Sequence, residues 1–206
     1  MKKYTIIVAL ILTSISGFSQ RVEPLLQNEI NGIIYMREEE KLARDVYDSL
    51  FGKWDVNPFG NIRKSEQVHM DNMKELIDTY KLADPVTNSG NKSGIFFNIK
   101  LQKHYNELVT AGTLSLIEAL KVGAKIEELD ISDLIKYSDS TNNKAILETY
   151  SFLKMASENH LRAFVRKLKM QGINYAPSIL SNKDFQTIIK SENKGCQKSK
   201  CKKCMD

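Results

Sequence analysis

Acidic residues and histidines recur along this sequence at intervals of three and four, the spacing that places side chains on one face of a helix. Glu66 and His69 are two such residues, and a helix would present both donors about one turn apart. Carboxylates combined with imidazoles, without thiolates, suit iron or manganese better than copper or structural zinc. The candidate metal ligands are Glu40, Glu66, His69, Glu127 and His160, with Asp130 as a further candidate.

Helices are the elements that would position these residues. Over the 206 residues, a 3.6-residue period dominates and alternation typical of strands is weak, which predicts an all-α domain. The scarce prolines fall where helices should start or stop. The sequence predicts four long helices, at about 25–51, 60–82, 115–137 and 142–171, a long loop at 86–98, and short helices at 98–111 and 181–190.

The inward stripe of each long helix, taken in alternating steps of three and four, is apolar except near its middle. The exceptions are Glu40 in the first helix, Glu66 and His69 in the second, Glu127 and Asp130 in the third, and His160 in the fourth. Burying an ionised carboxylate costs several kcal/mol unless a counter-charge compensates it. Several unpaired acids facing one core therefore predict a bound cation.

Each candidate also has a simpler interpretation. Glu40 lies in the charged run 38–41, which is typical of a solvated face, and only helical phase selects Glu127 over its neighbour Glu128. A single histidine is more often a hydrogen-bonded interior residue, and Asp130 could cap a helix or pair with a lysine. Glu158 is excluded, because two residues before His160 is about 200° around the helix.

Two stretches resemble the ligand motifs of rubrerythrin-type ferritin-like proteins. Residues 40–47 are similar to the first-helix motif E-x-x-A-x-x-x-Y, and residues 65–69 are similar to the second-helix motif E-x-x-H. The run from about 38 to 189, supported by residues 123–131 and 159–164, more closely resembles a family known as domain of unknown function 2202. The resemblance implies an antiparallel ferritin-like four-helix bundle, with a long crossover between helices 2 and 3 and a di-iron or related centre.

One position departs from that pattern. The fourth helix of such proteins usually carries a glutamate three residues before its histidine, and here Ser157 stands at that position. Asp130 could replace the missing carboxylate from helix 3; otherwise a single metal, or a labile second one, is expected. Tyr47 and Tyr150 could lie near the centre, and we interpret them as core aromatics with hydrogen-bonded hydroxyls.

The two ends of the chain differ in composition from the body at residues 20–190. Residues 1–19 begin with two lysines, continue with a short apolar run at 6–12 and end with small residues, which predicts a signal peptide cleaved after Ser19. The apolar run is too short to span a bilayer. We therefore expect export to the periplasm or the extracellular space, with no stable membrane insertion after cleavage.

The C-terminal segment 191–206 is rich in lysine and contains three cysteines, Cys196, Cys201 and Cys204. The two interpretations left open are one disulfide with a leftover thiol, and a second, soft-metal site for copper or zinc. Most of the net charge of +5 belongs to the two ends. The body is near neutral and lacks a basic face with interleaved aromatics, so nucleic acid is not an expected partner.

Three functions remain open at this point. The first is a redox enzyme in which one or two iron ions, or manganese, react with dioxygen or peroxide. The second is a module that sequesters or senses metal without turnover, with the cysteine segment as a second site. The third is a metal-free helical interaction domain that keeps polar core residues for specificity. The sequence predicts no substrate, electron donor or oligomeric state.

Overall fold

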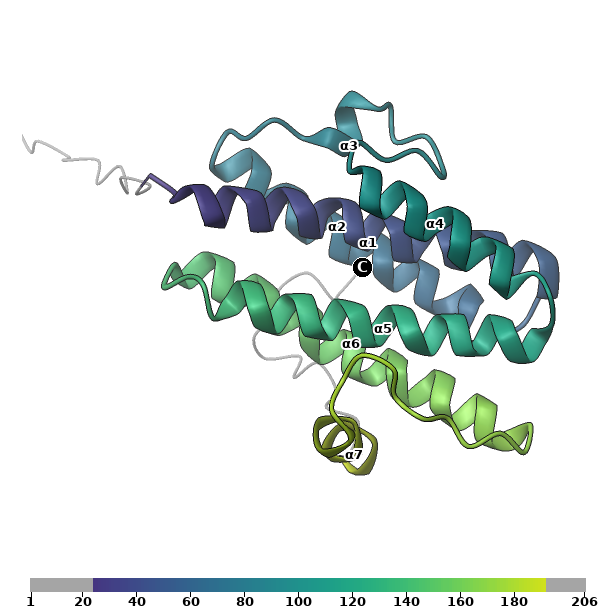
Figure 1. Ribbon diagram of the computed structural model, residues 1–206. Coiled ribbons are helices and arrows are strands. Elements are labelled where there is room, and N and C mark those ends of the chain that lie inside the picture. Colours follow the sequence, from purple (N-terminus) through teal and green to yellow (C-terminus); the bar gives the residue numbers. More distant parts are fainter. Residues whose placement is uncertain (1–23, 192–206) are drawn as a thin grey trace, which may run out of the picture.

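A computed structural model describes residues 24–191, and every regular element in that range is a helix (Figure 1). The prediction of an all-α protein is confirmed. The long helices are α1 (Gln27–Trp54), α2 (Phe59–Thr79), α5 (Leu116–Ser138) and α6 (Lys144–Met170). The short helices are α3 (Pro85–Asn88), α4 (Ile99–Gly112) and α7 (Asn182–Lys190). The predicted signal peptide and the three cysteines lie outside the described residues.

The long helices pack as two chain-neighbour pairs, α1 with α2 and α5 with α6, and each member of a pair also contacts a helix of the other pair. Within each pair the two helices run in opposite directions (Figure 1). A crossover containing α3 and α4 leads from one end of α2 to the other end of the molecule, so that α5 runs in the same direction as α2. The middles of all four long helices therefore face a common interior.

Side-chain caps mark several helix ends at the predicted positions. The Ser115 side chain accepts the Glu118 N–H at the start of α5, and Ser181 accepts the Asp184 N–H at the start of α7. Gly172, just after α6, has a φ of 77°, the left-handed conformation expected there.

Three boundaries differ from the prediction, one being the end of the second helix at Thr79 and not near residue 82. The first helix does not end at Gly52 but continues to Trp54, whose indole N–H donates to the Gly112 carbonyl at 2.9 Å. The turn falls instead on Asp55, with a φ of 47°. Part of the predicted loop 86–98 forms the short helix α3, because the Asp84 side chain caps it.

Two apolar clusters fill the interior, one toward each end of the long helices. One contains Ile33, Met73 and Leu153, and the other contains Leu50 and Phe164 with many more residues of α1, α4, α5 and α6. By their positions along the helices, the predicted ligands lie in the interval between these clusters. The polar layer is thus closed off by packed hydrocarbon on both sides.

The crossover lies against the outer side of α1, where buried charges hold it. Asp45 accepts from Lys41 Nζ at 2.5 Å and from the Gly94 N–H at 2.9 Å. Glu38 accepts from two backbone N–H groups of the crossover, at 2.6 and 3.1 Å. All four residues of the run 38–41 are buried, so the interpretation of this run as a solvated face is wrong.

Within residues 24–191 none of the helices combines the length and apolar character that a membrane span requires.

Candidate metal centre

The predicted ligands converge in the polar layer between the two apolar clusters. Glu40 comes from α1, Glu66 and His69 from α2, Glu127 from α5 and His160 from α6. The first four side chains are at most 3% exposed, and His160 is the most open, at 12%. Glu66 and His69 share one helical face because they are three residues apart, as their spacing predicts.

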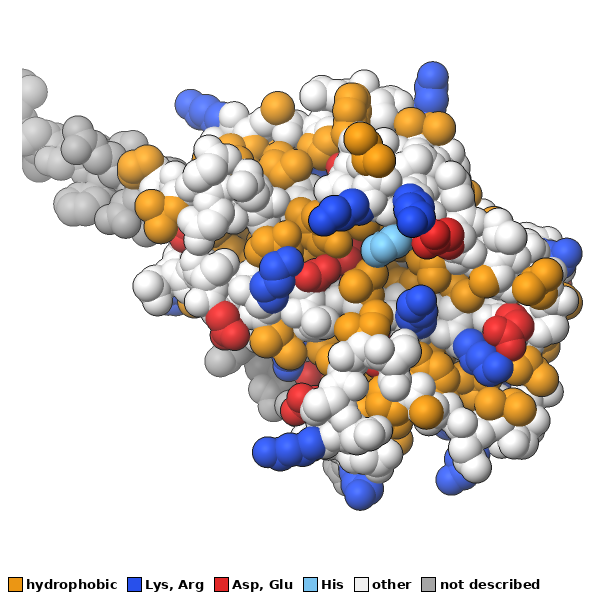
Figure 2. Space-filling model, in the orientation of Figure 1, with side chains coloured by type: hydrophobic (Ala, Val, Ile, Leu, Met, Phe, Trp, Pro, Cys, Tyr) orange, Lys and Arg blue, Asp and Glu red, His pale blue; other side chains and the backbone are white. Residues whose placement is uncertain are grey.

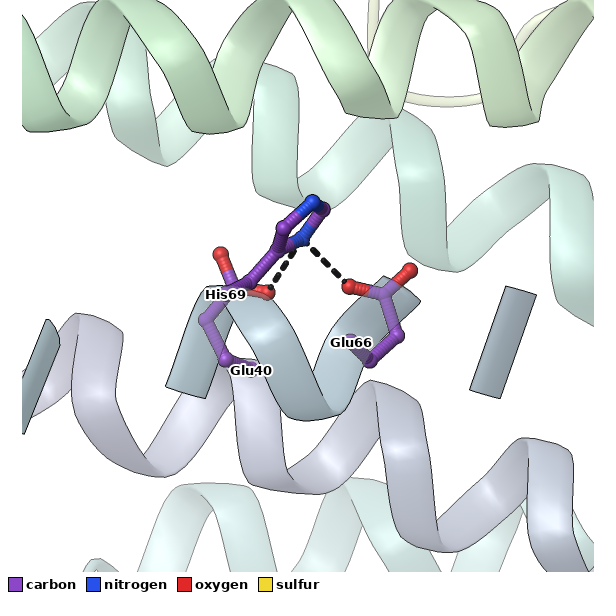
Figure 3. A group of neighbouring side chains, drawn as sticks. All are labelled: Glu40, Glu66 and His69. Carbon is purple, nitrogen blue, oxygen red and sulfur yellow. Dashed lines mark hydrogen bonds and ion pairs between the residues drawn. The ribbon is translucent and has the colours of Figure 1, made fainter. Parts of the chain in front are cut away.

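The first group of potential ligands consists of Glu40, Glu66 and His69 (Figure 3). The imidazole of His69 lies between the two carboxylates, with Nδ1 2.7 Å from Glu66 Oε2 and 3.2 Å from Glu40 Oε2. The three ligand atoms lie within 4.8 Å of one another and are buried. That separation allows one ion to contact all three.

The second group consists of Glu66, Glu127 and His160, again with ligand atoms within 4.8 Å. His160 Nδ1 lies 2.9 Å from Glu66 Oε1 and 3.4 Å from Glu127 Oε2. Glu66 therefore belongs to both groups and turns a different oxygen toward each histidine. The two imidazole rings stack with centroids 5.6 Å apart, which keeps the groups adjacent.

Burial and the neighbouring charges shift the pKa values of the acids and histidines in this layer. Burial raises the pKa of Glu40 to about 8 and raises the pKa of Glu127. Burial also acts on Glu66, but the two neighbouring imidazoles outweigh it and lower the pKa of that carboxyl. Against the effect of burial, Glu127 and Glu66 raise the pKa of His160 to about 10. The site thus attracts positive charge, which protons or metal ions can supply.

Several buried atoms of the site have no hydrogen-bond partner among the described residues. They are Glu40 Oε1, Glu66 Oε1, Asp130 Oδ1 and His160 Nδ1. Glu66 Oε1 and His160 Nδ1 approach to 2.9 Å, yet outside hydrogen-bond geometry. Unsatisfied lone pairs in a dry interior are costly. A cation fits the glutamates and the histidine of this set, because it would satisfy their oxygens and nitrogen together.

Asp130 is in neither group of potential ligands. The Ser157 hydroxyl donates to Asp130 Oδ2, and the pKa of Asp130 is raised well above its usual value, first by burial and then by Glu40. The serine at the position of the expected glutamate thus pairs with the aspartate that could have replaced it. The structure places both residues beside the site without bringing Asp130 into a triad.

Ser65 is a residue that the sequence prediction missed. Its hydroxyl oxygen lies 3.1 Å from His160 Nε2 and 3.4 Å from His69 Nε2. One oxygen can accept from both Nε2–H groups, which would leave both Nδ1 lone pairs available to a metal ion in place of a proton. Ser65 precedes His69 by four residues, so the spacing rule for one helical face could have found it.

The two tyrosines near the centre differ. The Tyr47 hydroxyl donates to Glu127 Oε1 at 2.6 Å, which confirms its interpretation as a hydrogen-bonded core aromatic. Tyr150 is also a core aromatic, but its hydroxyl is buried without a hydrogen-bond partner among residues 24–191, so the hydrogen-bond part of the interpretation is wrong there. The ring of Tyr150 packs in the apolar cluster of Ile33 and Met73, where acceptors are scarce.

Two neighbouring glutamates face away from the site. Glu128 is fully buried, but it accepts from the Tyr175 hydroxyl at 2.5 Å and from the backbone N–H groups of 178–180, so it holds the segment before α7 against α5. Glu158 pairs with Lys154 at 2.7 Å. Helical phase therefore selected the inward-facing acid correctly in α5 and excluded the outward-facing one in α6.

Comparison with known proteins places the chain in a family. The family described as uncharacterized protein domain DUF2202 matches residues 29–192. Uncharacterized protein MJ0754 of Methanocaldococcus jannaschii is 47% identical over 169 residues, covering 82% of this chain and 90% of that protein. The crystal structure of hypothetical protein MJ0754 from Methanococcus jannaschii is similar, with a TM-score of 0.81 at 46% identity over 85% of this chain and 99% of that one. The chain belongs to the DUF2202 family.

Proposed function

We propose that this protein is an exported ferritin-like four-helix bundle that holds two iron ions, or manganese in their place, and reacts with dioxygen or peroxide. The observation that supports this proposal most directly is that Glu66 turns one carboxylate oxygen to His69 and the other to His160. Each half of the layer then has its own imidazole, its own carboxylate and a share of Glu66. Two adjacent ions bridged by one glutamate account for this arrangement.

The donor chemistry supports iron or manganese. Oxygen and imidazole donors without a thiolate suit these metals. Three carboxylates, Glu40, Glu66 and Glu127, carry less negative charge than two divalent ions carry positive charge. Only five side chains would ligate the two ions, which would leave coordination positions for water or a small oxidant.

The helix arrangement supports a ferritin-like layout. Two antiparallel helix pairs joined by a long crossover, with ligands from all four helices, is the plan of di-iron bundles. The departure lies at Ser157, because such bundles carry a Glu-x-x-His in a second helix and this chain has serine three residues before His160, so its residues would hold the metal with one carboxylate fewer.

The chain's own residues would orient the ligands and restrict access. When bound, a ferrous pair supplies electrons for reduction of the oxidant. Tyr47 holds Glu127 in place through its hydroxyl, and Ser65 lies against the far nitrogens of both imidazoles. The apolar clusters exclude water from both ends. His160, the most open candidate ligand, marks the side near Ser65 as the route for a small oxidant.

Metal analysis and reaction with peroxide test this proposal. Protein purified without chelator is expected to carry close to two ions per chain, and the Glu158→Gln control is expected to keep them, because Glu158 faces away from the site. Repeated consumption of peroxide by the ferrous-loaded protein, with a reductant present, supports a redox enzyme. One stoichiometric oxidation would instead favour metal storage or sensing, and absence of bound metal would favour an interaction domain.

Export is tested separately from the metal centre. Mature protein recovered from outside the cytoplasm is expected to begin at Gln20, one residue after the predicted cleavage site. N-terminal sequencing of that fraction gives the result directly. A chain that retains Met1 and stays inside the cell would contradict export, and would leave the metal proposal unaffected.

A further inference from the structure

Three apolar side chains project from the crossover into solvent. Ile95 is 50% exposed, Phe97 is 62% exposed and Ile99 is 84% exposed, the highest value among the exposed large apolar residues. We call these three residues the apolar tip. Phe96, between the first two, is only 7% exposed. The chain therefore inserts one aromatic side chain into the core and turns its neighbours outward.

Buried polar groups hold the backbone of the tip firmly. Glu38 binds the backbone N–H groups of Phe97 and Asn98, and Lys41 donates to the carbonyl of Lys92 at 2.8 Å. The Lys41 ammonium also lies 4.3 Å from the centre of the Phe96 ring. A segment anchored by this many buried contacts is not a loosely attached loop. The outward position of the apolar tip is therefore part of the folded structure.

The surroundings of the tip are cationic. Residues 86–106 contain Lys92, Lys100 and Lys103 but no aspartate or glutamate, and the next acid along the chain, Glu107, lies 3.7 Å from Lys103 and offsets that lysine alone. All three lysines are exposed, whereas Glu38 and Asp45, the acids that contact the crossover from α1, are buried and engaged. Apolar and Lys or Arg side chains lie together along the upper edge of the molecule in Figure 2, over the crossover. Such a surface complements a negatively charged partner that also accepts hydrocarbon.

We propose that the apolar tip inserts into the headgroup region of an anionic lipid bilayer, with the adjacent lysines against the lipid phosphates. A protruding set of apolar side chains needs a hollow in a protein partner, whereas a lipid surface deforms around it. Apolar insertion combined with attraction to anionic lipid is how peripheral proteins bind reversibly. The proposal adds a docking surface and is independent of the metal centre. It involves adsorption to the surface and no membrane-spanning segment.

Tryptophan fluorescence at the tip tests the proposal in the full-length chain. Phe97→Trp is mixed with phosphatidylcholine vesicles that contain or lack phosphatidylglycerol, and the signal of Trp54 is subtracted using the parent protein. Emission is expected to shift to the blue and to be quenched by brominated acyl chains, only with phosphatidylglycerol. The readout is local to the tip, so tethering by residues 1–23 or by the lysine-rich end does not produce it.

Matched variants separate insertion from other binding. Leu114→Trp, at an equally exposed apolar position after α4, is expected to show no lipid quenching. Lys100→Gln is expected to weaken the vesicle-dependent signal roughly fivefold, whereas Lys144→Gln, on α6 and 89% exposed, leaves it unchanged. Equal quenching at both tryptophans, or no quenching at position 97, overturns the proposal. A shift that follows protein concentration without lipid also overturns it, because a second copy would then cover the tip.

Discussion

Helix α1 buries charge on two opposite sides, and the two sides neutralise it differently. Toward the crossover, Asp45 accepts from Lys41, from Arg44 at 2.7 Å and from a backbone N–H. Toward the interior, Glu40 faces His69 with one oxygen, and its other oxygen has no hydrogen-bond partner in the described chain. Both sides are almost inaccessible to water, so exposure does not explain the difference.

The difference indicates what each side needs from outside the chain. On the crossover side, lysine, arginine and backbone groups satisfy the carboxylates, and nothing further is required for folding. In the interior, carboxylates raise the pKa of imidazoles and burial raises the pKa of Glu40, so protons provide the compensation. Burial of charge alone therefore does not identify a functional site. A functional site is indicated when buried oxygen and nitrogen atoms from four helices also lack hydrogen-bond partners.

The largest effect is expected from Glu66→Gln, which tests whether the interior is one shared site. Because Glu66 contributes an oxygen to each group, the substitution should reduce the metal content from two ions to none after dialysis. Glu40→Gln changes only one group and should leave one ion. Elemental analysis of both variants beside Glu158→Gln gives the comparison. Equal metal loss in Glu40→Gln and Glu66→Gln would argue against a bridging role.

Asp45→Asn is expected to affect stability and not metal. Breaking a buried charge pair strands Lys41, which typically costs about 3–5 kcal/mol. Urea unfolding measures the loss of unfolding free energy, and metal content per folded chain should stay constant. The double variant Lys41→Met with Asp45→Leu should recover part of the loss, since Lys41 is no longer left unpaired, while Arg44 loses its carboxylate but keeps its bonds to Gln67 and Asn91. If Asp45→Asn instead lost metal at unchanged unfolding free energy, the crossover side of α1 would belong to the metal site, and the contrast between the two sides of α1 would be wrong.

The all-α class and the inward direction of the candidate ligands followed from periodicity. Steps of three and four placed Glu40, Glu66 and Glu127 in the interior, and the structure brings them together with both histidines. The same pattern could not show that the crossover folds back over α1, because that depends on contacts about 50 residues apart, such as Lys41 with the Lys92 carbonyl. From its composition alone, the run 38–41 was therefore interpreted as a solvated face, although the folded protein buries it.

Side-chain partners were harder to predict than side-chain direction. Phase placed Asp130 and Ser157 correctly in the interior, but phase alone cannot determine that they hydrogen-bond to each other. Tyr47 and Tyr150 both face the core, yet only Tyr47 has an acceptor in reach. Whether a buried polar atom finds a partner depends on rotamers and on the distance between helices, and neither is encoded in spacing.

Ser65→Ala is expected to weaken metal binding by about 10–100-fold while both ions still bind at saturation. The change removes the oxygen beside both Nε2 atoms and leaves every candidate ligand in place. Competition with a chelator measures the affinity, and Ser65→Thr should restore it. Ser49→Ala, which removes a hydroxyl bonded to the Asp45 carbonyl on the other side of α1, is the control. If Ser65→Ala only lowers unfolding free energy, Ser65 is a packing residue.

Asp130→Asn has the smallest expected effect, and it tests whether Asp130 is a metal ligand. Asp130 belongs to neither group, and burial raises its pKa well above the usual value, which favours the neutral carboxyl. An amide oxygen can still accept from the Ser157 hydroxyl, so metal affinity should change by no more than about 0.5 kcal/mol, or roughly twofold. Elemental analysis and chelator competition measure it. If Asp130→Asn removes one ion, Asp130 is a ligand that moves when metal binds, and the chain has replaced the missing helix-4 glutamate after all.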